Sequence, residues 1–403
     1  MIFLNRSWNI GNTQDKPAFH MVINEFLVTM LLRSILRIVT HKSGMYFTLL
    51  LIFFLATLPA GNAVNGAKPP SESFGQEEQI ERKLRHTQWT DMLPHTLEGD
   101  YYNEFWSYHI FLEGDLHLHV TFSLANFGSF KSPVSGGKLF VSNFKGSNYH
   151  VAREYDLDHL IVDEAQNKIR LHPGRDIYLT GRLPDEHHIY FKTSKDGVSY
   201  LVDLDFYDID QGYTWGDGIF RLENEEMGLF MHIPRASVNA TVAINDDTLE
   251  VSGTAYMDHT FQTNLSSKVV DKGFRHIAHT GSGYQAGYYL IPKRRSKTGV
   301  IGFAITKDNS PVTLEKPEQI TVIDSDRIGG RSVPRYVEIV YQSGNRRVLS
   351  RKVDFQHVSF LEEIGGIRRR LVRSFLGGEV IEYVGTGIID GDTPVNYNFF
   401  LVH

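Results

Sequence analysis

Strict alternation of apolar and polar residues recurs along much of this chain, and it limits the possible folds more than any other feature. In Leu116–Leu124 every even position is apolar, whereas the odd positions are polar and include His117 and His119. Val198–Phe206 repeats the alternation. A period of two is that of a β-strand with one buried face. The pattern therefore predicts half-buried strands, with the two histidines on a solvated face.

Similar runs continue to the C-terminus, and turn sequences such as Lys195-Asp196-Gly197 separate many of them. Long amphipathic helices are nearly absent, while 35 glycines and 12% aromatic residues favour sheets joined by tight turns. Many short antiparallel strands are typical of sandwiches and barrels. The chain is thus predicted to be all-β with few short helices, and its 403 residues suffice for two domains. Further strand-like runs are Ala240–Ile244, Leu249–Tyr256, Tyr284–Ile291, Val300–Thr306, Ile320–Asp324, Tyr336–Tyr341, Val348–Phe355, Glu379–Ile389 and Val395–Val402.

The N-terminal segment has the features of an export signal. Phe47–Leu58 is apolar over a length typical of signal peptides; basic residues precede it, and a small-residue stretch follows, where cleavage is expected after Ala63. Met30 and Met45 are alternative translation starts. We expect residues 1–63 to target the protein to the periplasm or the outside. If this segment is not cleaved, it would instead associate the protein with a membrane.

Charge and missing motifs exclude several functions. The formal net charge is −6, and loss of the basic N-terminal segment would make it more negative, so nucleic-acid binding is not expected. The chain has no cysteine, which excludes disulfides, thiolate metal sites and cysteine nucleophiles. It also lacks the G-x-S-x-G, H-E-x-x-H, Walker and dinucleotide-binding motifs. We expect no cofactor and no metal, because no third ligand can be identified for His117 and His119.

An acid and an imidazole lie side by side near the middle of the chain. Residues 253–261 read Gly-Thr-Ala-Tyr-Met-Asp-His-Thr-Phe and contain Tyr256, Asp258 and His259. Successive strand side chains point to opposite faces, so one of Asp258 and His259 faces an interior while the other braces it or meets solvent. Burial would raise the pKa of Asp258 and let it act as an acid, with His259 orienting a water, relaying a proton or bonding the carboxylate. Alternatively, Asp258 caps a turn and His259 packs against it.

This stretch resembles the Tyr/Trp-x-Asp-His motif of a lipocalin-like superfamily. Its members include the carotenoid 1,2-hydratases, the AttH proteins, the survival-factor-like proteins and certain fungal Diels–Alder cyclases. The resemblance implies two successive lipocalin-like antiparallel β-barrels with the motif near their junction. It also implies that an acidic residue protonates a carbon–carbon double bond, with Asp258, His259 and Tyr256 as catalytic residues. We accordingly expect a linker with a short helix over 64–94, and lipocalin-like domains over 95–253 and 254–403.

A second candidate segment follows the Asp-His pair. Gly273–His279 stands where the hydratase-like proteins have a motif rich in Trp and Arg, and it supplies Arg275 and His276 as candidate ligand-binding residues. Phe274 and histidines replace the tryptophans in this chain. A cationic intermediate would therefore find fewer aromatic faces here than in a carotenoid hydratase.

Two classes of function fit these features. In the first, the exported protein binds a hydrophobic or isoprenoid-like small molecule and acts as a cofactor-independent hydratase, isomerase or cyclase, with Asp258 as the acid. In the second, it is a non-catalytic lipid or small-molecule carrier that uses the same cavity. The Asp-His motif favours the enzyme, whereas the missing tryptophans and the export signal favour the carrier.

Overall fold

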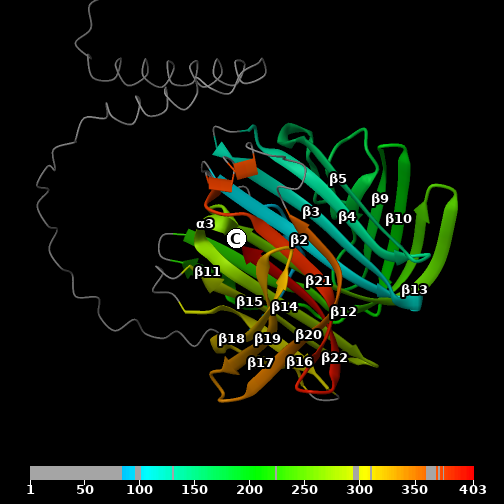
Figure 1. Cartoon of the computed structure of the whole chain (residues 1–403). Helices are drawn as coiled ribbons and strands as arrows, with labels where there is room; N and C mark the ends of the chain where they lie inside the picture. Colours follow the sequence, from blue (N-terminus) through cyan, green and yellow to red (C-terminus); the bar gives the residue numbers. More distant parts are fainter. Residues whose placement is uncertain are drawn as a thin grey trace, which may run out of the picture. The chain divides into compact units, whose positions relative to one another are not determined.

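The computed structural model describes residues 84–95, 101–128, 131–222, 225–293, 299–308, 311–359, 369–370, 373–374 and 376–403. These residues belong to one compact unit. The predicted signal segment, residues 1–63, lies outside them. Strands make up most of the described chain (Figure 1), which confirms the all-β prediction. The helical elements η1 (Trp89–Met92), η2 (Glu113–Asp115), η4 (Leu157–His159) and α3 (Ser266–Val269) span three or four residues each.

The first sheet contains the strands up to Gln262, and neighbouring strands in it pair antiparallel. Two strands lie off its main path: β11 (Tyr213–Leu222) pairs with β12 and with β1 (Leu84–His86). β1 and η1 both fall within the segment 64–94. Along the main path the order is β5 (Ser147–Asp156), β4 (Val134–Phe144), β3 (Leu116–Phe127), β2 (Tyr101–Leu112), β13 (Asp247–Gln262), β12 (Glu225–Ile244), β10 (Val198–Tyr207), β9 (His187–Lys195), β8 (Ile177–Thr180), β7 (Lys168–Arg170) and β6 (Ile161–Asp163).

The second sheet contains the strands from Val270 onward and is likewise antiparallel. The two sheets are therefore successive in the sequence, as predicted (Figure 1). The domain boundary between residues 253 and 254 stays a prediction, because strand pairing assigns residues to sheets and does not define folding units. The order in the second sheet is β17 (Thr313–Glu315), β16 (Ile301–Lys307), β15 (Gly283–Pro292), β14 (Val270–Thr280), β22 (Thr393–Val402), β21 (Val380–Ile389), β20 (Arg346–Ser359), β19 (Arg331–Tyr341) and β18 (Pro317–Ile328).

The hairpin between β9 and β10 confirms one of the predicted turns. Lys195 pairs with Val198, so Asp196 and Gly197 form a two-residue connection. Their φ values are 53° and 80°, which places both residues in the left-handed region that a type I′ turn requires. Glycine adopts this conformation without steric cost, and aspartate tolerates it. The local sequence is therefore sufficient to direct this hairpin.

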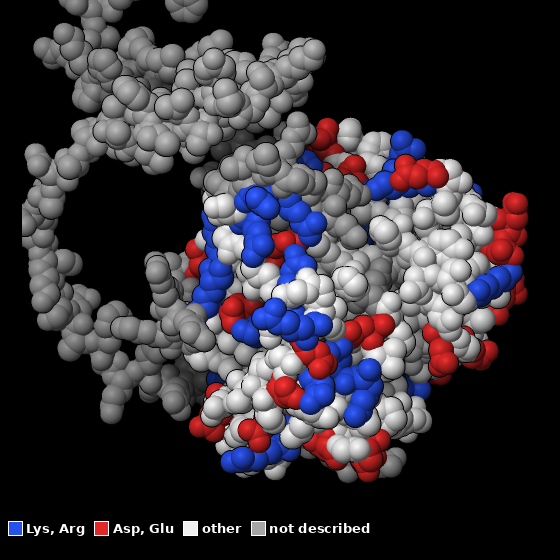
Figure 2. Space-filling view, in the orientation of Figure 1, with Lys and Arg blue, Asp and Glu red and all other residues white. Residues whose placement is uncertain are grey.

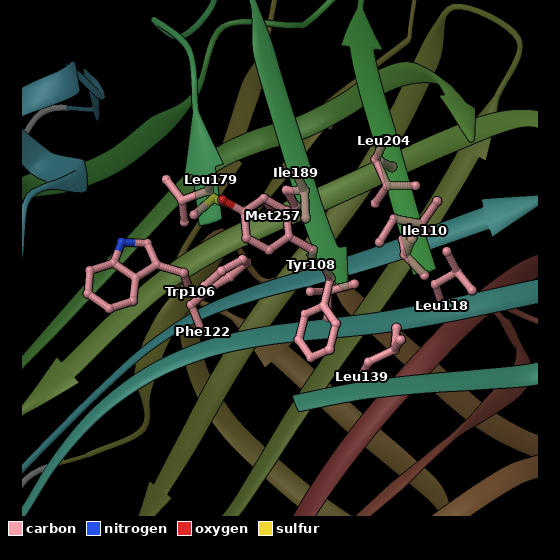
Figure 3. Packing of buried hydrophobic residues seen from close by; sticks show 14 of the residues in the cluster. Trp106, Tyr108, Ile110, Leu118, Phe122, Leu139, Leu179, Ile189, Leu204 and Met257 are labelled. Carbon is pink, nitrogen blue, oxygen red and sulfur yellow. The ribbon is translucent and has the colours of Figure 1, made fainter. Parts of the chain in front are cut away.

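Three buried apolar clusters show how the sheets pack. The first core is formed mainly by side chains from strands of the first sheet and includes Trp106, Tyr108 and Met257 (Figure 3). The second core lies inside the second sheet and includes Phe274 and Tyr289. A third cluster, here called the between-sheet core, joins the two sheets through Met227, Leu229, Met231 and Tyr256 of the first and Ile277, Tyr284, Ala286, Tyr288 and Leu290 of the second.

Strands at the junction are buried on both faces, and their sequences reflect this. On β13, Tyr256 belongs to the between-sheet core whereas the next residue, Met257, belongs to the first core. On β15, Tyr288 belongs to the between-sheet core whereas Tyr289 belongs to the second core. A strand between two cores must carry apolar or paired side chains at every position, which gives continuous apolar runs in place of alternation. Polar residues on these strands are therefore buried and need partners.

His117 and His119 are buried, with exposed fractions of 4% and 2%, and the prediction of a solvated face is wrong. Their face of β3 lies toward the second sheet. The rings of His117 and Phe355 have centroids 6.0 Å apart, and His119 Nδ1 lies 3.9 Å from Glu382 Oε1. The alternation in the sequence does form a strand, but the polar face is covered by the other sheet.

On the face shown in Figure 2, charged side chains of both signs are interspersed. Ion pairs also occur at partly exposed positions; Arg347 and Asp390, for example, lie 2.6 Å apart. No helix in the described part of the chain is long and apolar enough to cross a membrane.

Candidate functional site

Asp258 and His259 point to opposite faces of β13. Asp258 shares its face with Tyr256, which belongs to the between-sheet core. His259 shares its face with Met257 and Phe261, which belong to the first core. Both Asp258 and His259 are fully buried. The structure therefore separates the Asp-His pair into two environments, as the alternation of a strand requires.

Arg275 of β14 forms an ion pair with Asp258 across the junction between the sheets. Arg275 Nη2 donates to Asp258 Oδ1 at 2.9 Å, and Arg275 Nε lies 2.7 Å from Asp258 Oδ2. The guanidinium also lies over the ring of Tyr288, with Cζ 4.4 Å from the centroid. Two contacts to one carboxylate orient both groups, because the planar guanidinium matches the geometry of a carboxylate.

The ion pair is part of a larger network, here called the between-sheet polar cluster. Arg275 Nη1 donates to Asn398 Oδ1 at 2.7 Å and lies 3.1 Å from His109 Nε2. Asn398 Nδ2 in turn donates to Glu382 Oε1 at 2.7 Å, and Lys138 Nζ donates to Glu382 Oε2 at 3.3 Å. The cluster consists of Asp258, Arg275, Asn398, Glu382, Lys138 and His109, and Tyr256 lies beside it. Its two carboxylates are matched by two cationic groups, which limits the cost of burying charge.

Burial raises the pKa of the Asp258 carboxyl, while Arg275 opposes this rise by favouring the ionised form. Burial also acts to lower the pKa of Arg275, but Asp258 and Tyr288 more than compensate and the pKa lies above its ordinary value. Arg275 therefore stays charged. Asp258 combines a desolvated carboxyl with a fixed cation, which is a suitable setting for a group that gives up and regains a proton.

Other members of the cluster have shifted pKa values. Burial acts to raise the pKa of Glu382, but Lys138 and His119 together with hydrogen bonding lower it to about 2. Burial, followed by the neighbouring His119 and Arg275, holds the pKa of His109 well below its ordinary value. Glu382 is therefore a carboxylate and His109 a neutral imidazole near neutral pH. Neither is suited to donate a proton at that pH, which leaves Asp258.

Tyr256 has the least satisfied polar group at this site. Its side chain is fully buried, and its hydroxyl has no hydrogen bond of ordinary geometry to any described residue. Burial raises the pKa of Tyr256 well above its ordinary value, and the nearby Asp258 raises it further. The phenol therefore keeps its proton, and it can donate a hydrogen bond.

His259 is held on the other side of β13 and does not bond Asp258. Its Nε2 lies 2.7 Å from Glu104 Oε1, and its Nδ1 lies 2.8 Å from the carbonyl oxygen of Asp91. The ring stacks on Trp106, with centroids 4.5 Å apart and an interplanar angle of 14°. Of the predicted arrangements, the one in which Asp258 bonds His259 is not found. A catalytic role for His259 stays a prediction, and any such role involves Glu104.

His276 is separated from Arg275 in the same way. It points into the second core, where its ring lies 5.7 Å from that of Tyr289. Neither ring nitrogen has a hydrogen-bond partner in the described part of the chain, and burial lowers the pKa to about 3. The structure thus brings together Asp258, Tyr256 and Arg275, while His259 and His276 lie in two other environments.

Sequence reasoning missed three residues that contact the predicted ones, Glu104, His109 and Asn398, and a fourth, Glu382, that bonds Asn398. Glu104 could have been recognised from the sequence, because it is an acid within an aromatic run. In the structure its exposed fraction is 0%. The others stand in ordinary alternating strands. His109 and Asn398 become partners of Arg275, and Glu382 a partner of Asn398, only when β2, β21 and β22 are placed beside β13 and β14.

Solved structures with the same fold are known. The chain is similar to a protein assigned to AttH from Nitrosomonas europaea, with 13% identity and a TM-score of 0.55 over 77% of this chain and 99% of that one. It is similar to CghA, crystallised with Sch210972, with 9% identity and a TM-score of 0.50 over 75% and 88%. Kievitone hydratase from Nectria haematococca has 11% identity and a TM-score of 0.45 over 75% and 88%. No protein-family model and no curated protein matches the sequence.

The fold is therefore the lipocalin-like fold of AttH, built from two antiparallel sheets. This confirms the fold that the resemblance of residues 253–261 implies. At 13% identity the likeness extends to the fold, and the chemistry must be argued from the residues of this chain.

Proposed function

We propose that this protein binds a hydrophobic or isoprenoid-like small molecule at the between-sheet polar cluster and acts on it as a cofactor-independent hydratase, isomerase or cyclase. One observation carries the proposal: the buried Tyr256 hydroxyl lies beside the Asp258–Arg275 ion pair, interacts with the Asp258 carboxyl and makes no hydrogen bond of ordinary geometry to a described residue. Buried hydroxyl groups are nearly always hydrogen-bonded. A buried hydroxyl without a well-formed hydrogen bond, next to a buried acid, supports a role toward a bound molecule.

In the proposed reaction Asp258 is the acid. In the protonated form that burial favours, the Asp258 carboxyl transfers its proton to a carbon–carbon double bond, so that a C–H bond forms and the other carbon becomes cationic. Arg275 stabilises the carboxylate that remains. In a hydration, water adds to the cation and returns a proton to Asp258, which regenerates the acid without a cofactor. Tyr256 orients the water or a polar group of the substrate.

Access to this site requires movement, because Asp258 and Tyr256 are fully buried. Side chains of the between-sheet core would have to part when a ligand enters. The two-point contact between Arg275 and Asp258 also supports a second candidate function, a non-catalytic lipid or small-molecule carrier in which the ion pair is structural. The two candidates differ in whether Tyr256 and Asp258 are needed for turnover or only for binding.

The test begins with mass spectrometry of an organic extract from natively purified protein, which identifies a bound apolar compound. Turnover of that compound is then measured for the wild type, Tyr256→Phe and Asp258→Asn. Because the Tyr256 hydroxyl forms no hydrogen bond of ordinary geometry, Tyr256→Phe should leave the unfolding midpoint nearly unchanged. We expect it to lower kcat at least tenfold, and Asp258→Asn to abolish turnover while binding persists.

The matched control is Tyr289→Phe. This buried tyrosine lies in the second core, and its hydroxyl lies 2.7 Å from that of Tyr341. It should lose stability but keep its activity. Full turnover by Tyr256→Phe and Asp258→Asn, with ligand still bound, would show that the protein is a carrier. An empty extract would weaken the carrier hypothesis, because carriers tend to retain cargo.

We further propose that the protein is exported. The apolar segment Phe47–Leu58, the small residues up to Ala63 and the absence of cysteine support this proposal. Intact mass of the natively purified protein tests it, with a mature chain that begins after Ala63 as the expected result. A chain that retains this segment and sediments with membranes would instead support anchoring.

A further inference from the structure

We propose that His95, Glu104 and His259 form a binding site for a divalent transition-metal ion, with Zn²⁺ as the ion of choice. One ligand atom from each residue lies within 4.8 Å of the others. Two imidazoles and one carboxylate are a known ligand set for zinc, and they leave a position open for water or substrate. The site is independent of the proposed function, because it lies on the other face of β13 from Asp258.

The two imidazoles converge on a single oxygen of Glu104. His259 Nε2 lies 2.7 Å and His95 Nδ1 lies 3.2 Å from Glu104 Oε1. Two ligand atoms of a tetrahedral zinc ion lie about 3.3 Å apart, so the 3.2 Å separation fits an ion directly, whereas the 2.7 Å hydrogen-bond distance would lengthen when an ion binds. Glu104 and His259 are fully buried, whereas the His95 side chain is 28% exposed. His95 therefore gives an ion a path from solvent to two buried ligands.

The surroundings of His259 supply an independent observation. Its two ring nitrogens both face oxygen acceptors, the Asp91 carbonyl at 2.8 Å and Glu104 at 2.7 Å. An Nδ1–H that donates to the Asp91 carbonyl leaves Nε2 directed at Glu104, where it is available as a ligand. A metal ion would bind at Nε2. The Nδ1–H bond to a backbone carbonyl then orients the ring, as is usual for metal-bound histidines.

The neighbouring groups also hold the ligands in place. The Tyr102 hydroxyl donates to Glu104 Oε2, and Trp106 stacks on the His259 ring. Trp106 lies in the first core (Figure 3), and its Nε1 donates to the Met92 carbonyl at 3.0 Å. The bond from Trp106 to the Met92 carbonyl and the contact between His259 and the Asp91 carbonyl attach the segment 84–95 to the first sheet. Binding of an ion would therefore link His95 more firmly to β2 and β13.

The wide separation of the three ligands along the chain explains why no metal site was predicted from the sequence. His95 and Glu104 are separated by 9 residues and His259 follows Glu104 by 155. No spacing motif connects them. They meet because β13 pairs with β2, which places His259 opposite Trp106 and diagonal to Glu104.

The experiment uses the full chain, purified without a polyhistidine tag, stripped with a chelator and titrated with Zn²⁺ against a chromophoric competitor. We expect one Zn²⁺ per chain, and Co²⁺ should give the visible absorption of a tetrahedral site. His95→Ala should weaken Zn²⁺ binding at least about tenfold, since even residues that only support a ligand cost this much. Glu104→Gln should weaken it as much or more. His95→Ala decides the question if Glu104→Gln fails to fold, because His95 is half-buried.

His188→Ala is the matched control. His188 Nε2 lies 2.7 Å from Asp203 Oδ1 at a partly exposed position of β9, so it is an imidazole–carboxylate pair outside the proposed site. This variant should bind Zn²⁺ like the wild type. The proposal is overturned if the wild type binds no stoichiometric Zn²⁺, or if His95→Ala binds it as tightly as the wild type does. Glu104 would then be a hydrogen-bond centre that holds the segment 84–95 on the sheet.

Discussion

Removal of Arg275 should destabilise the protein far more than removal of a surface arginine. Arg275→Met leaves the Asp258 carboxylate buried without its cation, and it also removes the donors to Asn398 and His109. Breaking a buried ion pair in this way costs about 3–5 kcal/mol, because the remaining charge is desolvated and unpaired. Arg335→Met is the surface control. Arg335 pairs with Asp324 but is 45% exposed, so its loss should cost about 0–1 kcal/mol.

The double variant Arg275→Met/Asp258→Leu separates the cost of an unpaired charge from the cost of a lost side chain. Replacing a buried ion pair by apolar residues of similar volume is often neutral or stabilising. We therefore expect the double variant to recover most of the stability that Arg275→Met loses. Lys138 and Glu382 remain paired in it, so the junction stays balanced in charge.

Urea unfolding followed by tryptophan fluorescence provides the measurement. Unfolding free energies are compared only between variants whose free energies depend on urea concentration with the same slope. A loss below about 1 kcal/mol for Arg275→Met would refute the reasoning, since it would mean that water reaches Asp258 and that the pair is not buried in solution. A double variant as unstable as Arg275→Met would show that the loss comes from packing at the junction. Either result would remove the electrostatic basis of the proposed acid.

The remaining predictions concern pH and close packing. His276 has a folded pKa of about 3 and an ordinary value of 6.5, so the unfolded state binds more protons between these values. The contribution of His276 to stability is fully present above pH 6.5 and is lost as the pH falls toward 3. The variant His276→Gln should therefore show a smaller decline of the melting temperature over that pH range. If the melting temperature of the variant falls as steeply with pH as that of the wild type, His276 is not buried as described. Gly287→Ala would place a Cβ 2.2 Å from Tyr289 Oη and 2.4 Å from His276 Cε1, which should cost about 1–3 kcal/mol. Gly299→Ala meets no atom within 4 Å and should change the unfolding free energy little; equal losses for the two would show that steric crowding is not the cause.

The strands, and which of their side chains share a face, could be predicted because both depend on local sequence. Alternation over Leu116–Leu124 is part of strand β3, and Asp196-Gly197 closes the predicted hairpin. The same local rule placed Asp258 and His259 on opposite faces. Each of these features depends on residues only a few positions apart, and backbone geometry alone relates such residues in space.

The environment of each face was decided by tertiary structure. His117 and His119 have the alternation of a solvated face, yet they are buried because the second sheet covers them. The partners of the predicted site residues are likewise distant: Arg275 bonds Asn398 and His109, which are 123 and 166 residues away. By itself, the sequence determined that Asp258 and His259 would lie on opposite faces of one strand. Only the packing of two sheets determined that Arg275 meets one of them and Glu104 the other, because burial and pairing depend on which surfaces are brought together.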